Sequence, residues 1–363
     1  MTDANYAHRP EGPMPFMQIW TVNLMRKTVK ASLLMAVLSL PIAAWALEPE
    51  VQAAKDEGMR LYNIGHSTAA LSYLQQAAEA GDVDAMYYMG ETERRQHMMG
   101  LTREAMAWYL RAAEHGDPYA MLQLFRGGAC IAGDRCPEGS DGWREAALEI
   151  TLPKAEAGDP DAMLALYHIY AHLDASRLTG VYNMLGIPTR AGKWLKRAAG
   201  AGLPEAQALW GQQIRGGRGW YFTNGRRLAA AEEWFRRAAE QGYVPGMSGL
   251  AHALIAQERY DEAWEWMQIA SEHGHVEQRF GVGWCYLDPQ RDGRCRNEVD
   301  KVKGWAILYS LAVETHYDLY KWAVRDHRDE LTEEEVEEAE ALAEAEWIGR
   351  QPPLSNFPPR FGY

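Results

Sequence analysis

The sequence predicts an all-α fold built from a tandem array of helix pairs. Three observations predict it. A glycine-centred motif recurs through most of the 363 residues, alanines keep fixed distances from each glycine, and bulky apolar residues recur at helical spacing between them. Such recurrence is typical of a repeat protein. The marker glycines, spaced 35, 42, 44, 40 and 32 residues apart, are Gly81, Gly116, Gly158, Gly202, Gly242 and Gly274.

A helix, called helix B, is expected before each marker glycine. Eleven residues before the glycine stand Ala70, Ala105, Ala147, Ala191, Ala231 and Ala263. Eight residues before it stand Tyr73, Trp108, Ile150, Trp194, Trp234 and Trp266. These positions share one helical face, with small residues where another backbone must come close and bulky residues where volume must be filled. The glycine is expected to adopt the left-handed conformation that ends a helix.

A second helix, called helix A, is expected to begin after each marker glycine. Asp117-Pro118 and Asp159-Pro160 indicate an N-cap followed by a first-turn proline. Four residues after the glycine stand Ala85, Ala120, Ala162, Ala206, Gly246 and Gln278, and eight after it Met89, Leu124, Leu166, Trp210, Leu250 and Val282. They again form one apolar stripe. The repeating unit is therefore helix A, a variable loop, helix B and a glycine turn.

This unit resembles the Sel-1-like repeat, a relative of the tetratricopeptide repeat. The resemblance covers residues 47–315 and is carried by Ala-x-x-x-Leu-Gly in helix A, Ala-x-x-Trp in helix B and the closing Ala-Ala-Glu-x-Gly. Phe125 and Tyr167 depart from it, because they stand where the family prefers the glycine of helix A. The resemblance implies a right-handed α/α solenoid of about seven helix pairs. It also implies a protein-binding role, in a family whose members are linked to envelope assembly, exopolysaccharide export and host interaction.

Residues 1–46 are expected to hold an N-terminal extension and a signal peptide. A basic stretch at 26–30 precedes a short apolar run, and Ala44-Trp45-Ala46 predicts cleavage after Ala46. The residues before Met25 do not resemble a signal peptide, so translation is expected to start there. An uncleaved membrane anchor is the alternative, although the apolar run is shorter than the ~20 residues that a membrane span needs.

Two further segments follow the repeats. Residues 316–349 are expected to form C-terminal helices that cap the array, and Thr332 with Glu335 predicts a capping box at the start of an acidic helix. Residues 350–363 are rich in proline and aromatic residues and are expected to form a flexible tail. The alternative for this tail is an extended segment that docks in the groove of the solenoid.

Four cysteines form two close pairs, Cys130 with Cys136 and Cys285 with Cys295, each between a helix A and a helix B. An even number in an exported chain predicts disulfides. Spare thiols or cross-pairing are the alternatives. A metal site is not expected, because neither pair has the gap of two to four residues that zinc ligands favour. No cofactor is predicted.

The chain is acidic except in one loop. Its formal net charge is −13, and residues 1–46 hold four basic and two acidic residues, so the remainder carries −15. This charge makes nucleic acid an unsuitable partner. Residues 206–231 contain no Asp or Glu. The residues of this arginine-rich loop that are candidates for binding a partner are Arg215, Arg218, Trp220, Tyr221, Phe222, Arg226 and Arg227.

Guanidinium groups and aromatic rings in this loop are suited to an anionic glycan or an acidic protein. The alternative is structural: the aromatic side chains fold back onto the neighbouring repeat, and the arginines pair with its carboxylates.

An extended array offers a large concave face and little enclosed volume, which favours binding over catalysis. We therefore predict a non-enzymatic periplasmic scaffold or adaptor of a bacterial envelope complex. Its partner is expected to be an envelope protein, and it contacts the membrane only through the signal segment before cleavage.

Two alternatives remain open. One is a module that binds peptidoglycan or acidic exopolysaccharide. The other is a β-lactam-interacting enzyme, implied by cysteine-rich members of the family that the chain resembles. Those members have a cysteine pair in every repeat, whereas this chain has two pairs in all.

Overall fold

The computed structural model describes residues 47–97, 101–129, 136–137, 141–171, 189–290, 293–315 and 317–361. The chain divides into two units, Met1–Glu48 and Pro49–Tyr363, and all of the described helices lie in the second. The expected signal peptide, its cleavage after Ala46 and the start at Met25 lie outside the described residues. Among the helices of the described part, none has both the length and the apolar character needed to cross a membrane.

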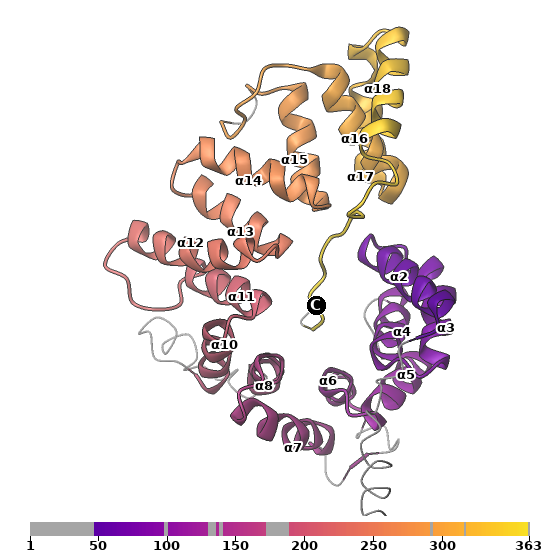
Figure 1. Cartoon of the computed structure of the whole chain (residues 1–363), viewed down its shortest axis with the longest axis vertical. Helices are drawn as coiled ribbons and strands as arrows, with labels where there is room; N and C mark the ends of the chain where they lie inside the picture. Colours follow the sequence, from indigo (N-terminus) through magenta and orange to yellow (C-terminus); the bar gives the residue numbers. More distant parts are fainter. Residues whose placement is uncertain are drawn as a thin grey trace, which may run out of the picture. The chain divides into compact units, whose positions relative to one another are not determined.

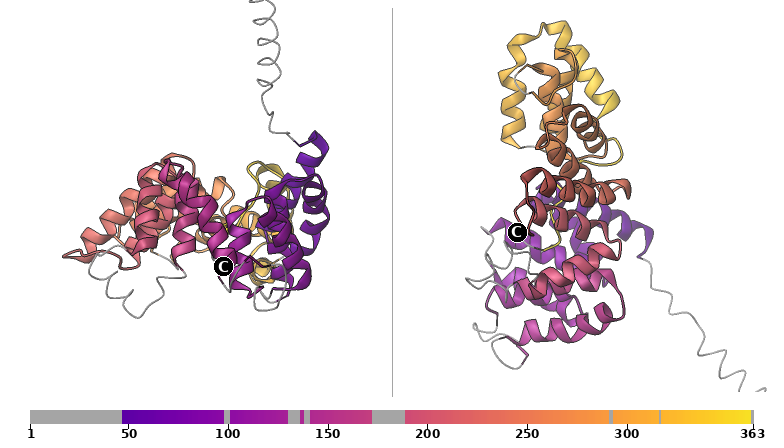
Figure 2. Two further views of the ribbon diagram at one scale, coloured as in Figure 1. Left: turned by 90° about the horizontal axis from the view of Figure 1, so that it is seen from below. Right: turned by 90° about the vertical axis from the view of Figure 1, so that its left-hand side faces the viewer.

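The second unit confirms the predicted all-α array. Its described residues contain seven pairs of helices A and B: α2 (Pro49–Asn63) with α3 (Ser67–Glu79), α4 (Val83–Gln96) with α5 (Arg103–Glu114), α6 (Pro118–Arg126) with α7 (Gly142–Glu156), α8 (Pro160–Ala171) with α10 (Arg190–Gly200), α11 (Pro204–Arg215) with α12 (Asn224–Glu240), α13 (Val244–Ile255) with α14 (Tyr260–Glu272), and α15 (Val276–Leu287) with α16 (Lys301–Thr315). Each helix B packs on its own helix A and on the helix A that follows. Figures 1 and 2 show the pairs in succession along an arc.

The turns between pairs are built as the sequence predicts. All six marker glycines have positive φ, between 82° and 106°. At the first of them, the Gly81 amide donates to the Ala78 carbonyl and the Asp82 amide to the Ala77 carbonyl, which satisfies two groups at the end of α3. Asp117 then caps α6, and its carboxylate accepts a hydrogen bond from the Ala120 amide at 2.7 Å.

The predicted stripes are buried, with one correction. The alanines eleven residues before the marker glycines are all buried, as are the residues four and eight after them. Of the bulky residues eight before the glycine, Tyr73 is exposed and the others are only partly buried, and the guanidinium of Arg111 lies over the ring of Trp108. The core position is one residue later, because it lies a full helical turn after the buried alanine. It holds Leu74, Tyr109, Thr151, Leu195, Phe235 and Met267.

Three further elements follow the array: α17 (Asp318–Asp326), a 3₁₀ turn (Arg328–Glu330) and α18 (Glu333–Glu346). The α18 helix packs on α16 and buries Ala339 and Ala343 there. Its predicted capping box is present, since the Thr332 amide donates to the Glu335 carboxylate at 2.7 Å and the Glu335 amide donates to the Thr332 hydroxyl at 3.2 Å.

The first helix pair also contacts the last. Ile64, in the turn between α2 and α3, is 1% exposed and packs in one cluster with Val276, Leu311 and Leu354. Beside it, a ring nitrogen of His66 lies 2.8 Å from the carbonyl oxygen of Thr315 at the end of α16. The array therefore closes on itself through an apolar contact between its two ends.

The tail differs from the expectation that it is flexible. Residues 351–361 run along the inner side of the arc (Figure 1). Ser355 pairs with the start of α15, where its amide donates to the carbonyl of Gly274 at 2.9 Å. The Asn356 amide donates to the carbonyl of Asn63 at 3.0 Å. Helix ends leave backbone groups without partners inside the helix, and the tail supplies partners at two of these ends.

His275 caps α15 beneath the tail. Its Nδ1 accepts a hydrogen bond from the Gln278 amide at 3.4 Å, and its ring centre lies 5.7 Å from that of Phe357. Burial lowers the pKa of His275 to about 4, and His252 adds to this shift while Glu277 opposes it. The folded protein therefore holds a neutral imidazole at pH 7.

The contact between the two ends is expected to stabilise the whole unit. Replacing Ile64 with alanine leaves a cavity in a buried cluster and should lower the free energy of unfolding by about 2–5 kcal/mol, measured by urea titration. The control is Val299→Ala at an exposed residue, which should change stability by less than ~0.5 kcal/mol. Equal effects of the two substitutions would show that the ends of the array do not pack together.

Acid is expected to destabilise the unit through His275. Because the pKa is ~6.5 in an unfolded chain and about 4 in the folded one, the unfolded state binds more protons between these values. Stability is therefore present above about pH 6.5 and falls by roughly 2–3 kcal/mol as the pH drops toward 4. Urea titrations at about pH 7 and 4.5 measure the loss. The His275→Asn variant keeps a side chain that can cap α15 but does not titrate, so it should lose less stability between these pH values. The same loss in the variant and in the parent protein would exclude His275 as the cause.

Candidate functional site

The inner face of the arc, defined as the face on which residues 351–361 lie, carries a row of carboxylates. The third residue after a marker glycine is acidic in four repeats, namely Asp84, Asp161, Glu205 and Glu277. Each lies in the first turn of a helix A, where the helix dipole favours a negative charge. One register position of the repeat thus produces an acidic stripe along the inner face.

Arg360 of the tail is bound at the beginning of this stripe. Its guanidinium pairs with Asp84 at 2.8 Å and with Asp117. Asp117 is 5% exposed, and its two oxygens have separate roles: one caps α6 through the Ala120 amide, and the other accepts from Arg360. Burial raises the pKa of Asp117, while Arg360 and the Ala120 amide oppose that rise. The arginine therefore compensates a carboxylate that burial alone would favour in its neutral form.

Two tyrosine rings complete the arginine site. The guanidinium carbon of Arg360 lies 5.1 Å from the ring centre of Tyr87 and 5.0 Å from that of Tyr119. The Tyr87 hydroxyl donates a hydrogen bond to the backbone carbonyl of Arg360. Aromatic faces attract a guanidinium and favour it over a compact ammonium. The site thus recognises the side chain and the main chain of one residue together.

Phe361 fills a slot beside the arginine site. It is 5% exposed, and its ring centre lies 5.2 Å from that of His168 and 6.0 Å from that of Tyr119. The guanidinium carbon of Arg126 lies 5.1 Å from the same ring. We call Arg360, Phe361 and the side chains that contact them the anchor site.

Of the three cavities that tail residues line in the described part of the chain, two contain residues of the acidic stripe. One, of about 190 Å³, is lined by Arg360 together with the acidic residues Asp117, Asp159 and Asp161. The other, of about 300 Å³, is lined by Glu205, Arg215 and the tail residues Phe357 and Pro359. The tail therefore does not fill the inner face.

Glu205 and His252 line the larger cavity and have altered acidities. Burial raises the pKa of Glu205, and the neighbouring Asp161 adds to that rise while Arg360 opposes it. Burial also lowers the pKa of His252, against an opposing effect of Glu277. A cationic group placed in this cavity would favour the ionised form of Glu205.

The predicted arginine-rich loop separates into two parts. Arg215 and Arg218 lie over rings of the helices, 5.8 Å from the ring centre of Phe235 and 5.6 Å from that of Trp210. Arg215 also lines the larger of the two inner cavities described above. These two arginines lie over aromatic rings of α11 and α12, the two helices that flank the loop.

The other part of the loop projects outward. Trp220 is 76% exposed and Phe222 79% exposed, and their ring centres lie 5.8 Å apart. The guanidinium carbon of Arg226 lies 5.8 Å from the ring centre of Phe222, and Arg227 donates to Asn224 at 2.6 Å. Two of the predicted aromatic residues thus do not fold back onto the neighbouring repeat.

Tyr221, between these two aromatic residues, has a different environment. It is partly buried, and burial raises the pKa of its hydroxyl. The structure therefore places only part of the predicted set of seven residues in one exposed group.

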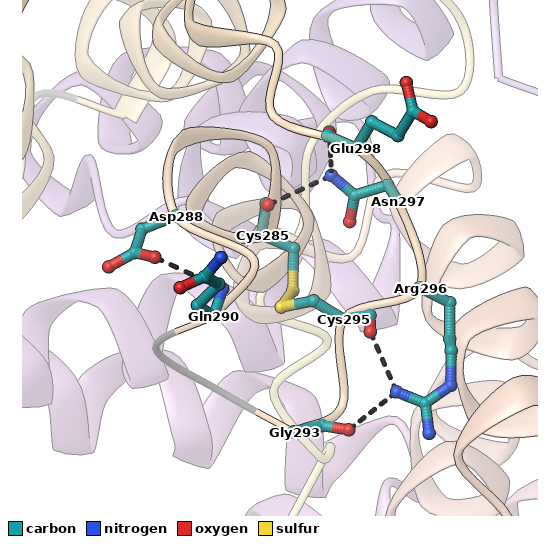
Figure 3. Close-up of a disulfide and its surroundings, with 8 residues drawn as sticks. All are labelled: Cys285, Asp288, Gln290, Gly293, Cys295, Arg296, Asn297 and Glu298. Atoms are coloured by element: carbon teal, nitrogen blue, oxygen red, sulfur yellow. Dashed lines mark hydrogen bonds between the residues drawn. A yellow bond between two sulfur atoms is a disulfide. The ribbon is translucent and has the colours of Figure 1, made fainter.

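One predicted disulfide is present. Cys285, near the end of α15, is bonded to Cys295 in the loop before α16, with 5.3 Å between their Cα atoms (Figure 3). Hydrogen bonds hold both half-cystines: Asn297 donates to the Cys285 carbonyl at 3.0 Å and Arg296 to the Cys295 carbonyl at 2.8 Å. Cys136 is also disulfide-bonded, and Cys130 lies outside the described residues.

The anchor site was not predicted as a site from the sequence. A signal for it exists, because residues 351–363 contain a single basic residue, Arg360, and the repeat register contains the acidic stripe. Only the alternative in which the tail docks in the groove of the solenoid would have placed Arg360 beside the acidic stripe.

No family model matches the chain. The chain is similar to an uncharacterised protein of Neisseria meningitidis serogroup B, with 28% identity over 248 residues, which make up 62% of this chain and 47% of that protein. It therefore spans about half the length of the curated relative it matches.

Two solved structures resemble the unit. A protective antigen present in uropathogenic Escherichia coli strains, which displays an SLR fold, has a TM-score of 0.45 and 21% identity, over 82% of this chain and 61% of that one. A Sel1 repeat protein from Oxalobacter formigenes has a TM-score of 0.37 and 22% identity, over 74% of this chain and 99% of that one. Both belong to the repeat class that the sequence resembles. At these scores the likeness carries no argument about function, and the fold assignment rests on the helix pairs themselves.

Proposed function

We propose that this chain is a non-enzymatic protein-binding scaffold that holds an extended segment of a partner protein on its inner face. The observation that carries the proposal is the tail itself. Its residues 355–361 occupy that face through backbone pairing at Ser355 and Asn356 and through the side chains of Arg360 and Phe361. An extended segment held by main-chain bonds and side-chain pockets is a recurrent mode of peptide recognition.

We also propose that the scaffold works in the periplasm of a bacterial envelope, with an envelope protein as its partner. The disulfide between Cys285 and Cys295 supports an oxidising compartment. The signal-like pattern before Ala46 supports export. An anchor formed by an uncleaved signal segment is the alternative for how the protein is held in the envelope.

A second candidate function is binding of an anionic glycan, such as peptidoglycan or acidic exopolysaccharide. The observation that favours it is the exposed pair Trp220 and Phe222, with Arg226 over the second ring. Exposed rings can stack on sugar faces while a guanidinium pairs with acidic groups. A β-lactam-interacting enzyme remains the weakest alternative, because the cysteine pairs do not recur in every repeat.

The scaffold proposal predicts that a partner crosslinks to the inner face and not to the outside. A photo-crosslinking amino acid in place of the exposed Asp161 should capture one envelope protein in living cells, identified by mass spectrometry. The control carries the same amino acid in place of Glu233, which is exposed on α12 and lines neither inner cavity. No adduct from position 161, or identical adducts from both positions, would refute the proposal.

The glycan candidate predicts that the exposed aromatic pair carries the binding. Replacing both Trp220 and Phe222 with alanine should weaken sedimentation with peptidoglycan or acidic polysaccharide at least tenfold, which corresponds to ~1.4 kcal/mol. Tyr73→Ala, at an exposed aromatic residue on α3, is the matched control and should bind like the parent protein. Unchanged binding by the double variant would eliminate this candidate.

A further inference from the structure

We propose that residues 357–361 are a resident ligand of the inner face, and that a partner segment with an arginine followed by an aromatic residue replaces them. This inference rests on the scaffold function proposed above and names the chemistry of its partner. The geometry that points to it is the anchor site, in which one arginine and one phenylalanine of the tail occupy a built pocket.

The first step of the argument is that the anchor site is specific for a cation. A capping carboxylate needs one oxygen for the helix amide, and Asp117 uses its Oδ1 for Ala120. Its Oδ2 faces Arg360, and Asp84 pairs with the same guanidinium at 2.8 Å. Because Asp117 is nearly fully buried, leaving its charge without a counter-charge would be costly. An occupant with a positive group therefore favours the ionised form of Asp117, as Arg360 does.

The second step is that the site selects arginine followed by an aromatic residue. The rings of Tyr87 and Tyr119 border the guanidinium, and the Tyr87 hydroxyl fixes the carbonyl of the same residue. The residue that follows in the chain enters the slot beside His168. The anchor site thus contacts the side chains of two consecutive residues and the backbone carbonyl of the first.

The third step is that the tail is replaceable. Pro358 and Pro359, which precede the arginine, have no backbone N–H to donate to the inner face. Of the cavities beside the tail, one is lined by Asp159 and Asp161 and another by Glu205 and Glu277. A partner segment with further cationic or larger side chains would fill space and meet charges that the tail leaves unused.

The fourth step is that a tethered tail sets a threshold for binding. A segment attached to its own receptor competes at an effective concentration on the order of millimolar. A free segment of equal affinity is therefore largely excluded, and only a segment with additional contacts displaces the tail. The tethered tail thus supplies a counter-charge to the carboxylates when no partner is bound. It also restricts binding to partner segments that make additional contacts.

The test uses a fluorescent nonapeptide with the sequence of residues 355–363 and the full mature chain. Fluorescence anisotropy should show weak binding to the parent protein and at least tenfold tighter binding to the Arg360→Ala/Phe361→Ala variant, whose anchor site is open. The matched control is Arg350→Ala, at the arginine just before the docked tail, which donates to the Ala345 carbonyl away from the anchor site. It should bind the peptide as weakly as the parent does.

Two further changes test the chemistry. A peptide with alanine in place of its arginine should lose at least tenfold in affinity for the open variant. Adding Asp117→Asn to the open variant should have a similar effect, because asparagine keeps the helix cap and removes the charge. If the double variant proves unfolded by circular dichroism, Arg360→Gln with Phe361 retained replaces it and should show the same direction of change.

Equal binding of the peptide to parent and open proteins, or binding that ignores the peptide's arginine, would overturn the inference. The two proposals fail differently. A partner crosslinked from position 161 with no peptide binding would leave the scaffold function intact and refute the resident ligand. Peptide binding to the open variant with no partner recovered from cells would refute the scaffold function instead.

Discussion

The left-handed turn at each marker glycine is the constraint on which the rest of the unit depends. Because all six glycines lie at positive φ, the helix B before each one ends, and the helix A after it begins, at a fixed distance from that glycine. Residues at one distance from the glycine therefore occupy equivalent places in successive pairs. Alanines at the packing positions let neighbouring helices approach closely, and the polar positions at the first turn fall on one side of the array.

That regularity explains how a binding face arises without a dedicated domain. The dipole at the start of each helix A favours an acidic residue there for reasons of helix stability alone. Repetition then aligns these residues on the inner face, where Asp84 and Asp117 bind the guanidinium of Arg360. Asp117 serves both the helix and the tail with different oxygens of one carboxylate. Structural and recognition roles are thus combined in the same residue.

Local patterns in the sequence predicted the local structure. The helix pairs, the glycine turns, the cap at Asp117 and the capping box at Thr332 all follow from residues within one or two helical turns of each other. The bulky core position was placed one residue too early, because periodicity identifies a face of a helix more firmly than the centre of that face. Trp108 consequently lies at the edge of its buried stripe.

The candidate site depended on contacts that no local pattern contains. The partner of Ser355 at Gly274 and the partner of Asn356 at Asn63 are distant in sequence, so the tail has no periodicity that reveals its docking. Composition suggested flexibility because proline-rich ends usually lack partners. In the arginine-rich loop, sequence identified the exposed Trp220 and Phe222 but could not distinguish them from Arg218, which packs on a helix ring.

The contact of Ile64 with the last helix pair has a consequence for how such a protein can evolve. In an open array each pair touches only its neighbours, so a pair can be gained or lost with modest effect on the others. Here the two ends meet, and Ile64 is buried against Val276 and Leu311 of the seventh pair. An added or deleted pair would change the circumference and separate these side chains. The contact between the ends therefore favours a fixed number of repeats, whereas the loops between helices A and B can change in length without separating it.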